Sequence, residues 1–306
     1  MKRLELHISY RCLNDCLFCS EQDALSMLKG KIMPTGIILR KIRQFYLKGY
    51  RHVTFTGGEP SLHSNFINIV QFAKLLGYTT YVTTNGGEFS KKRFSEVALE
   101  HLDEICFSVH GSNYKVHDFL TRKRGSFNNL KKALDRFETH RTPTFGLANI
   151  VITRYNIKIL KSIINMLAEY KKIKQLIFSN FSPEGGGLKN FNDLMVPLKQ
   201  IQEKIPELVD CCRHFSFKPV FFGLPLCTLF GHEELSNDYW WSPRTTIELL
   251  KQPKKTLLKT TYSFKPNRER VQTKKCESCL KKNVCGGMFE KYIHALDDFE
   301  LSPFRS

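Results

Sequence analysis

The chain of 306 residues contains no apolar run near the roughly eighteen residues that a membrane helix needs, which excludes a spanning helix on sequence grounds. Its first residues pass from charge into an alternating pattern without the apolar block of a secretory signal, so we expect a cytoplasmic protein. No solenoid repeat is present. With 42% hydrophobic and 25% charged residues, the composition also excludes disordered and fibrous proteins.

Acidic residues are scarce relative to basic ones. The chain has 29 Asp and Glu against 47 Lys and Arg, a net charge of +18, which favours an anionic partner or a strongly solvated surface. Residues 243–282 carry twelve of the basic and three of the acidic side chains. We interpret this stretch as a solvated basic loop. The alternative is a surface where Tyr262 and Phe264 stack on bases while lysines contact phosphates.

The ten cysteines are too sparse for a disulfide scaffold in a chain of this length. Six of them fall in two tight groups, and in a reducing compartment such spacing indicates metal binding or catalysis. Three others fit neither group. Cys106 is expected to be a small buried hydrophobe within a strand, and the adjacent Cys211 and Cys212 are left unassigned.

A regular alternation of short β-rich runs and helix-period segments fills the first two thirds of the chain. It predicts an α/β fold with a parallel sheet, and six units are too few for a closed eight-stranded barrel. We therefore predict a partial (β/α)6 TIM-type barrel over 1–190, followed by a small cysteine-rich region over 191–306. Chemistry is expected at the carboxyl ends of the strands. The predicted strands are 4–9, 52–56, 79–84, 104–110, 145–153 and 175–181.

The alternation stops near residue 182. We expect 182–187, which holds three consecutive glycines, to be a loop without helix or strand. A helix over 194–209 and a short strand near 217–222 are predicted to follow.

The first cysteine group directly follows the first strand. Cys12, Cys16 and Cys19 have the spacing C-x3-C-x2-C. Structural zinc sites usually use four ligands, so three thiolates on one loop favour a [4Fe–4S] cluster with one open iron, and a zinc loop is the alternative.

The second predicted strand ends in Gly57, Gly58, Glu59 and Pro60. Paired glycines allow a backbone to approach a ligand closely, and a carboxylate offers a negative charge to an ammonium group.

Small polar residues follow or interrupt other strands of the same sheet. Asn85 and Ser108 lie at the ends of the third and fourth strands, and Asn149 lies inside the apolar fifth strand. A buried Asn needs hydrogen-bond partners, and either a sugar hydroxyl or a neighbouring backbone group would serve. Arg122 could reach a carboxylate or could be a solvated loop charge. His7 and His110 face the same region, and we assign neither as catalytic.

The C-x3-C-x-(aromatic)-C and GGEP motifs together resemble the radical S-adenosylmethionine (radical SAM) superfamily. The resemblance implies that the three cysteines hold the cluster and that SAM binds its fourth iron. It further implies that Phe18 packs on the adenine and that Gly57–Pro60 hold the methionine amino group. Asn85, Ser108 and Asn149 are then candidates for the SAM ribose and carboxylate.

The second cysteine group is Cys276, Cys279 and Cys285, with Cys227 some fifty residues earlier. Four thiolates complete one tetrahedral site, and spacing alone does not separate zinc from iron–sulfur. The region is similar to the twitch and SPASM domains of radical SAM enzymes, which implies an auxiliary [4Fe–4S] cluster. A full SPASM domain has more cysteines, and Phe289 stands about where one would follow, so we expect one fully ligated auxiliary cluster.

The resemblance implies reductive cleavage of SAM to a 5′-deoxyadenosyl radical that abstracts hydrogen from a substrate. Its electron would come from a low-potential donor of the flavodoxin or ferredoxin type. The preferred substrate is a peptide or protein side chain, or another anionic molecule. A tRNA- or RNA-modifying enzyme and a small-molecule dehydrogenase or epimerase are alternatives. A zinc-binding nucleic-acid module would be a non-enzyme alternative, but it does not explain the GGEP motif. No membrane partner is expected.

Overall fold

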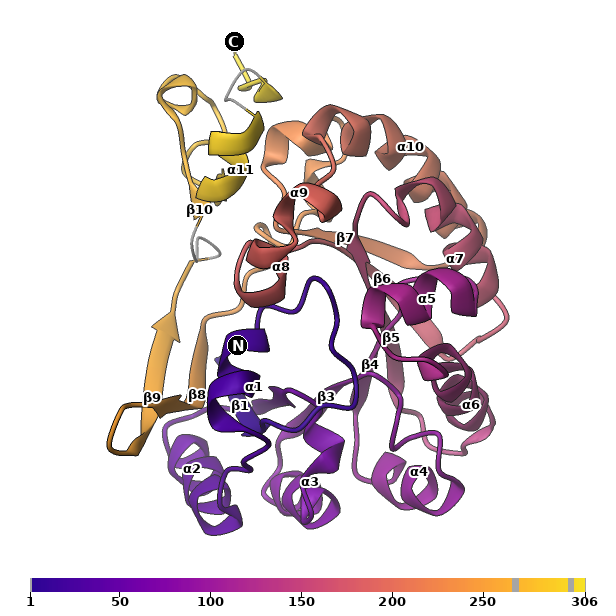
Figure 1. The fold of residues 1–306 in the computed structure, drawn as a ribbon, viewed down its shortest axis with the longest axis vertical. Coiled ribbons are helices and arrows are strands. Elements are labelled where there is room, and N and C mark those ends of the chain that lie inside the picture. Colours follow the sequence, from indigo (N-terminus) through magenta and orange to yellow (C-terminus); the bar gives the residue numbers. More distant parts are fainter. Residues whose placement is uncertain (1, 266–269, 297–299, 306) are drawn as a thin grey trace.

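In a computed structural model of the protein, which describes residues 2–265, 270–296 and 300–305, one curved sheet forms a partial barrel (Figure 1). All six predicted strands are present, and each pairs in parallel with its neighbours. The predicted α/β partial-barrel fold is confirmed. The six strands are β1 (Arg3–Ser9), β2 (His52–Gly57), β3 (Thr79–Thr84), β4 (Glu104–Ser108), β5 (Phe145–Ile152) and β6 (Ile173–Asn180).

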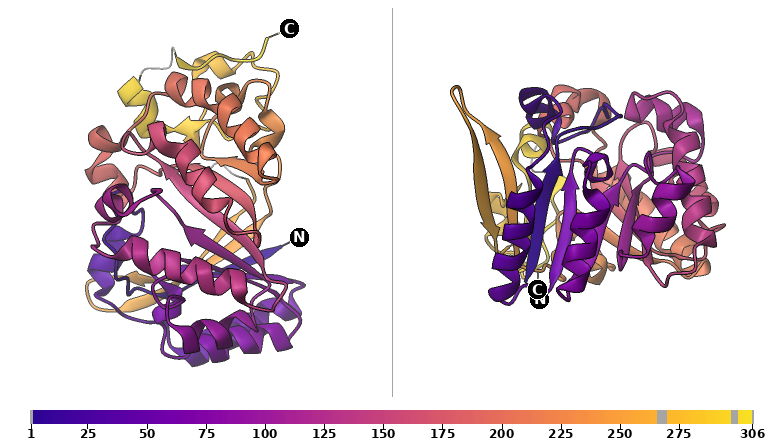
Figure 2. Two further views of the ribbon diagram at one scale, coloured as in Figure 1. Left: turned by 90° about the vertical axis from the view of Figure 1, so that its right-hand side faces the viewer. Right: turned by 90° about the horizontal axis from the view of Figure 1, so that it is seen from below.

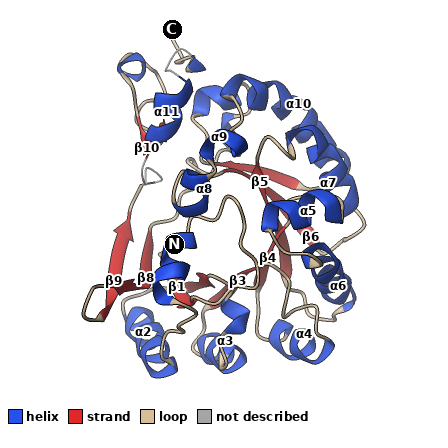
Figure 3. Ribbon diagram, viewed as in Figure 1, coloured by secondary structure: helices blue, strands red, loops and turns tan. Residues whose placement is uncertain are grey.

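Helices cover the outer face of the sheet (Figures 2 and 3). In α2, the buried residues Ile38, Ile42 and Phe45 recur at helical spacing and so form one apolar face toward the sheet. The main covering helices are α2 (Thr35–Leu47), α3 (Phe66–Leu75), α4 (Lys92–Leu99), α5 (Tyr114–Thr121), α6 (Ser126–Thr139), α7 (Leu160–Leu167) and α10 (Leu198–His214).

Side chains alternate along β1 between the helix-covered face and the barrel interior. Leu4, Leu6 and Ile8 are fully buried in the hydrophobic core. Arg3, Glu5 and His7 instead line the interior cavity. Because successive side chains of a strand point to opposite faces, β1 is apolar on one face and charged on the other.

The sheet continues beyond residue 190. β7 (Lys218–Phe222) pairs in parallel with β6, and β8 (Arg244–Lys251) pairs in parallel with β1. β9 (Thr256–Ser263) pairs antiparallel with β8 and forms the edge of the nine-stranded sheet (Figure 1). The division into 1–190 and 191–306 stays a prediction, and the sheet itself crosses residue 190.

The interpretation of 243–282 as a basic loop is wrong over its first half, which is the β8–β9 hairpin. Thr245 and Ile247 are buried against the sheet, while lysines extend from the hairpin turn and its outer edge. The basic composition concealed an alternating strand pattern.

The prediction of a loop over 182–187 is confirmed for 182–184 but is wrong from Gly185 onward. Gly185–Lys189 form the short helix α8, and Phe191–Leu194 form α9. The amide of Gly186 donates to the carbonyl of Cys19 at 2.8 Å. A Cβ on Gly185 would lie 2.7 Å from the carbonyl oxygens of both Cys19 and Ser20. These glycines therefore allow α8 to pack directly on the first cysteine loop.

Short elements complete the described chain. Among the described residues, no helix is both long and apolar enough to cross a membrane. A two-stranded antiparallel sheet, β10 with β11, organises the C-terminal region. The elements are α1 (Gln22–Leu28), η1 (Pro60–Leu62), η2 (Ile157–Ile159), η3 (Leu226–Leu229), η4 (Glu233–Leu235), β10 (Arg270–Val271), η5 (Lys274–Cys276), β11 (Met288–Phe289) and α11 (Glu290–Leu296).

Candidate cofactor and substrate site

The first three cysteines lie on the connection between β1 and α1 and line one cavity of about 530 Å³. Burial raises the pKa of the Cys12 thiol to about 11 and that of Cys19 to about 12, and it raises the pKa of Cys16 well above its usual value. Thiols in such surroundings are neutral unless a metal replaces the proton. Cys106 on β4 also lines the cavity, but only Cys12, Cys16 and Cys19 share one loop. Three thiols on one loop fit a cluster with one open iron.

The GGEP segment holds the first cysteine loop through its backbone. The amide of Gly58 donates to the Ser9 carbonyl at 2.8 Å, and the amide of Glu59 donates to the Arg11 carbonyl at 2.7 Å. A Cβ on Gly58 would lie 2.6 Å from the Arg11 carbonyl oxygen. Gly57 has φ +118°, and its Cβ would meet the Ser9 carbonyl at 2.4 Å. The glycines thus permit close approach to the protein's own cysteine loop.

Glu59 is buried between the carboxyl ends of β2 and β3 and accepts four hydrogen bonds. Its Oε1 accepts from the Ser61 amide and hydroxyl and from the Thr84 hydroxyl, at 2.5–3.2 Å. Its Oε2 accepts from the Asn85 amide at 2.7 Å. Burial raises the pKa of Glu59 despite these bonds. Because Oε2 accepts a single bond from the described residues, it retains a lone pair for a donor such as an ammonium group.

The other predicted SAM contacts surround the same cavity, which Phe18, Asn85, Ser108 and Asn149 line. Phe18 packs edge-on against His110 with ring centroids 4.5 Å apart. The side-chain Nδ2 of Asn85 donates to the Cys12 sulfur at 3.7 Å. Pro60 is buried and begins η1, so it shapes the turn after β2. The roles of these residues toward SAM stay predictions.

Asn149 and Arg122 have partners that the sequence did not reveal. The Ser179 hydroxyl donates to Asn149 Oδ1 at 2.7 Å, so this partner is a side chain on β6, neither a sugar nor the backbone. Arg122 is half exposed, lies 3.5 Å from Asp15 and does not line the cavity.

Burial beside His117 holds the pKa of His110 well below its usual range, so His110 is neutral.

Charged and polar side chains line the barrel interior below the cysteines. Barrel interiors are ordinarily filled by branched apolar residues, but here Arg3, Glu5, His7 and Arg244 line the cavity. Burial opposes the charge on His7, yet Glu21 and Glu5 outweigh it and raise the pKa of His7 to about 10. His7 and Arg244 likewise outweigh burial at Glu5 and lower its pKa to about 2. The interior is therefore a polar chamber. Along β1 these charged residues alternate with Leu4, Leu6 and Ile8. That alternation was the sequence signal that could have revealed a polar interior.

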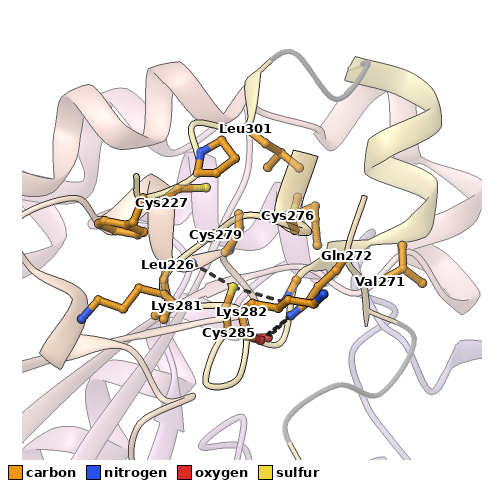
Figure 4. A pocket seen from close by; sticks show the side chains of 15 residues that line it. Leu226, Cys227, Val271, Gln272, Cys276, Cys279, Lys281, Lys282, Cys285 and Leu301 are labelled. Atoms are coloured by element: carbon orange, nitrogen blue, oxygen red, sulfur yellow. Dashed lines mark hydrogen bonds between the residues drawn. The ribbon is translucent and has the colours of Figure 1, made fainter. Parts of the chain in front are cut away.

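The second cysteine group converges although Cys227 is distant in sequence. Cys227, Cys276, Cys279 and Cys285 line one pocket (Figure 4). Two amides, from Leu226 and Gly287, approach the Cys285 sulfur at 3.4 and 3.3 Å. Burial raises the pKa of Cys227 to about 11. Four thiols with amide donors around one sulfur fit a fully ligated metal centre.

A buried ion pair fixes this pocket. Arg270 donates to both carboxylate oxygens of Asp238 at 2.7 and 2.9 Å and also to the carbonyl of Gly287. The Gly286 amide donates to the same carboxylate at 2.8 Å. Both side chains are almost fully buried, so the pair orients the turn that carries Cys285.

The family described as the radical SAM superfamily matches residues 6–167, which span β1 to α7 and include the three cysteines and the GGEP segment. This protein belongs to the radical SAM superfamily. Membership implies SAM and a [4Fe–4S] cluster as cofactors, which the donor set of Cys12, Cys16 and Cys19 fits.

Curated relatives of this radical SAM protein include peptide- and nucleotide-modifying enzymes. It is 29% identical over 199 residues to the PqqA peptide cyclase of Rhodopseudomonas palustris, covering 65% of this chain and 52% of the relative. It is 23% identical over 214 residues to the S-adenosylmethionine-dependent nucleotide dehydratase of Flammeovirga pacifica, covering 66% of this chain and 70% of the relative. The chain thus spans about half the length of the cyclase.

Solved structures share the fold. Streptococcus suis SuiB bound to S-adenosylmethionine superposes with a TM-score of 0.66 at 17% identity, covering 99% of this chain and 76% of SuiB. The enzyme anSMEcpe with bound AdoMet gives a TM-score of 0.57 at 18% identity, covering 70% of this chain and 61% of anSMEcpe. The radical SAM barrel and the C-terminal elements of this protein therefore have a common architecture with SuiB.

Proposed function

We propose that this protein is a radical SAM enzyme that abstracts a hydrogen atom from a peptide side chain. The observation that carries the proposal is the single cavity of about 530 Å³, which joins the three cysteines, the Glu59 region and the polar barrel interior. A cofactor at the cysteines and a substrate in the interior would share this one cavity.

When bound and reduced, the cluster and SAM supply a 5′-deoxyadenosyl radical. The chain's own residues bind and orient these two cofactors. Cys12, Cys16 and Cys19 would hold the cluster, and Glu59, fixed by its hydrogen bonds from Ser61, would accept the methionine ammonium.

A peptide substrate is favoured by the relatives and by charge. The cyclase related by sequence is named for a peptide, and SuiB has been solved with its precursor peptide SuiA. A net charge of +18 attracts acidic peptides. The match to a nucleotide dehydratase favours a nucleotide as the second candidate substrate.

We further propose that Cys227, Cys276, Cys279 and Cys285 hold one auxiliary [4Fe–4S] cluster. With four thiolate ligands it would have no open iron, so it would relay electrons or stabilise the C-terminal region without binding substrate. A low-potential flavodoxin- or ferredoxin-type donor would supply the electrons. We also propose a cytoplasmic location, because thiols stay reduced in that compartment and remain available as metal ligands.

The test is transfer of deuterium. Reconstituted protein would be incubated without oxygen with SAM, dithionite and a library of deuterated peptides that contain acidic residues, and the 5′-deoxyadenosine would be analysed by mass spectrometry. Deuterium in 5′-deoxyadenosine is expected with the peptide. If 5′-deoxyadenosine gains deuterium only when a deuterated nucleoside triphosphate is supplied, the nucleotide is the substrate in place of the peptide. If neither compound transfers deuterium, the proposal is contradicted.

A further inference from the structure

Two arginines lie side by side in the barrel interior, away from the cysteines. Arg3 and Arg244 are register partners on the adjacent parallel strands β1 and β8, and both line the cavity. Adjacent strands are about 4.8 Å apart, so the two side chains begin close together. Placing two like charges together in a partly buried site is costly unless anions accompany them.

The described residues leave this pair short of acceptors. The Nε atoms of both Arg3 and Arg244 are buried and have no hydrogen-bond partner among the described residues. Arg244 has one ion pair, with Glu5 at 3.5 Å, and its guanidinium stacks on Trp241 at 4.0 Å. The Arg3 guanidinium lies over the face of Tyr81, 5.8 Å from the ring centroid, and no carboxylate of the described residues forms an ion pair with it. Burial and the neighbouring Arg3 lower the pKa of Arg244.

The nearby carboxylates are already engaged. Glu5 lies between His7 and Arg244, and Glu104 pairs with His52 at 3.2 Å. Glu21 pairs with His7, its Oε2 lying 3.4 Å from His7 Nδ1. Arg3, Arg244 and His7 carry three positive charges, and the carboxylates of Glu5 and Glu21 neutralise two of them. One positive charge remains, which matches a monoanion better than a phosphate with two or more charges.

We propose that Arg3 and Arg244 bind a carboxylate of the substrate, which rests on the proposed peptide function and narrows it to acidic peptides. A guanidinium presents a planar fork of N–H donors that matches a carboxylate. The unpartnered Nε atoms supply donors that no described residue of the chain uses.

The register of the sheet sets the distance from this site to the cysteine end of the cavity. Tyr81 pairs with Thr54, and Thr54 pairs with Glu5, so the Arg3 guanidinium over Tyr81 lies near the level of Glu5. Four residues of β1 separate Glu5 from Ser9, about 13 Å along the strand. An extended peptide covers this in about four residues. The carboxylate is thus expected about four residues from the reacting residue.

The test uses binding, without turnover. The probes are the acetylated and amidated pentapeptides Ala-Ala-Glu-Ala-Ala and Ala-Ala-Gln-Ala-Ala, with ATP as a phosphate probe, titrated into the reconstituted protein and followed by ligand-observed NMR. Wild type is expected to bind the Glu peptide at least tenfold more tightly than the Gln peptide. Arg3→Gln and Arg244→Gln should each remove most of this preference. Arg43→Gln, an exposed arginine on α2, is the matched control and should keep it.

Iron content and thermal unfolding establish that each variant is folded. If a Gln variant does not fold, Arg3→Lys keeps the charge without the planar fork and should still reduce the preference several-fold. Equal binding of the two peptides by wild type, or an unchanged preference in folded Arg3 and Arg244 variants, overturns the proposal. Tighter binding of ATP than of the Glu peptide overturns the choice of a carboxylate. Because this assay needs no SAM cleavage, a failure here is distinguishable from a failure to transfer deuterium.

Discussion

Gly58→Ala tests why the GGEP segment contains its second glycine. The structure places an added Cβ 2.6 Å from the Arg11 carbonyl oxygen and 2.8 Å from a Leu25 methyl group. The leucine can move, but the carbonyl belongs to the backbone that leads into Cys12. Overpacking of this kind costs about 1–3 kcal/mol. Loss of the adjacent hydrogen bond from the Glu59 amide to Arg11 adds about 1 kcal/mol.

The expected loss is therefore about 2–4 kcal/mol in the free energy of unfolding, measured by urea denaturation of the metal-free protein. Iron bound after reconstitution should fall as well, because the displaced backbone carries the first cluster ligand. Gly36→Ala is the matched control. Gly36 lies in α2 with no atom within 4 Å of an added Cβ, so alanine there should be neutral or slightly stabilising. Wild-type stability and iron content in Gly58→Ala would refute this reasoning.

Three further predictions concern other parts of the molecule. Cys227→Ala should lower the iron content from about eight to about four per chain while SAM cleavage without substrate persists, and full iron content would remove Cys227 from the cluster. Asp238→Ala should cost about 3–5 kcal/mol in unfolding, because it leaves Arg270 buried without its carboxylate, and a loss below about 1 kcal/mol would contradict this. The raised pKa of His7 predicts a contribution to stability that is complete below pH 6.5 and is lost as the pH rises to about 10. Unfolding measured against pH should show this alkaline decline in wild type relative to His7→Gln, and parallel curves would contradict it.

The strand–helix alternation was sufficient to predict the partial barrel, because each strand is a short apolar run bounded by turn residues. The cysteine spacing and GGEP were sufficient to predict the cofactor class, because three thiolates on one loop have few other uses. The sequence could not show that Gly58 approaches the carbonyl of Arg11, since that contact joins two different strand ends.

The errors have a common physical origin. The three glycines at 185–187 were predicted to lie in a loop without helix or strand, but in the structure they allow α8 to pack closely on the cysteine loop. Arg244 and the basic residues from Lys251 onward concealed a strand that buries only Thr245 and Ile247. In both cases tertiary contact, which local composition does not encode, decided the conformation.

The pairing of Arg3 with Arg244 was likewise invisible in the sequence. The two residues are separated by most of the chain and become neighbours only because β8 joins the sheet beside β1. Once that pairing is known, the alternation along β1 shows which side chains line the interior.

The most direct test of the central claim is release of 5′-deoxyadenosine by anaerobically reconstituted protein given SAM and dithionite. Wild type is expected to release it slowly without substrate, whereas a variant with Cys12, Cys16 and Cys19 all changed to alanine should release none. Zinc without iron–sulfur in the wild type, or equal release by the triple variant, would contradict the account.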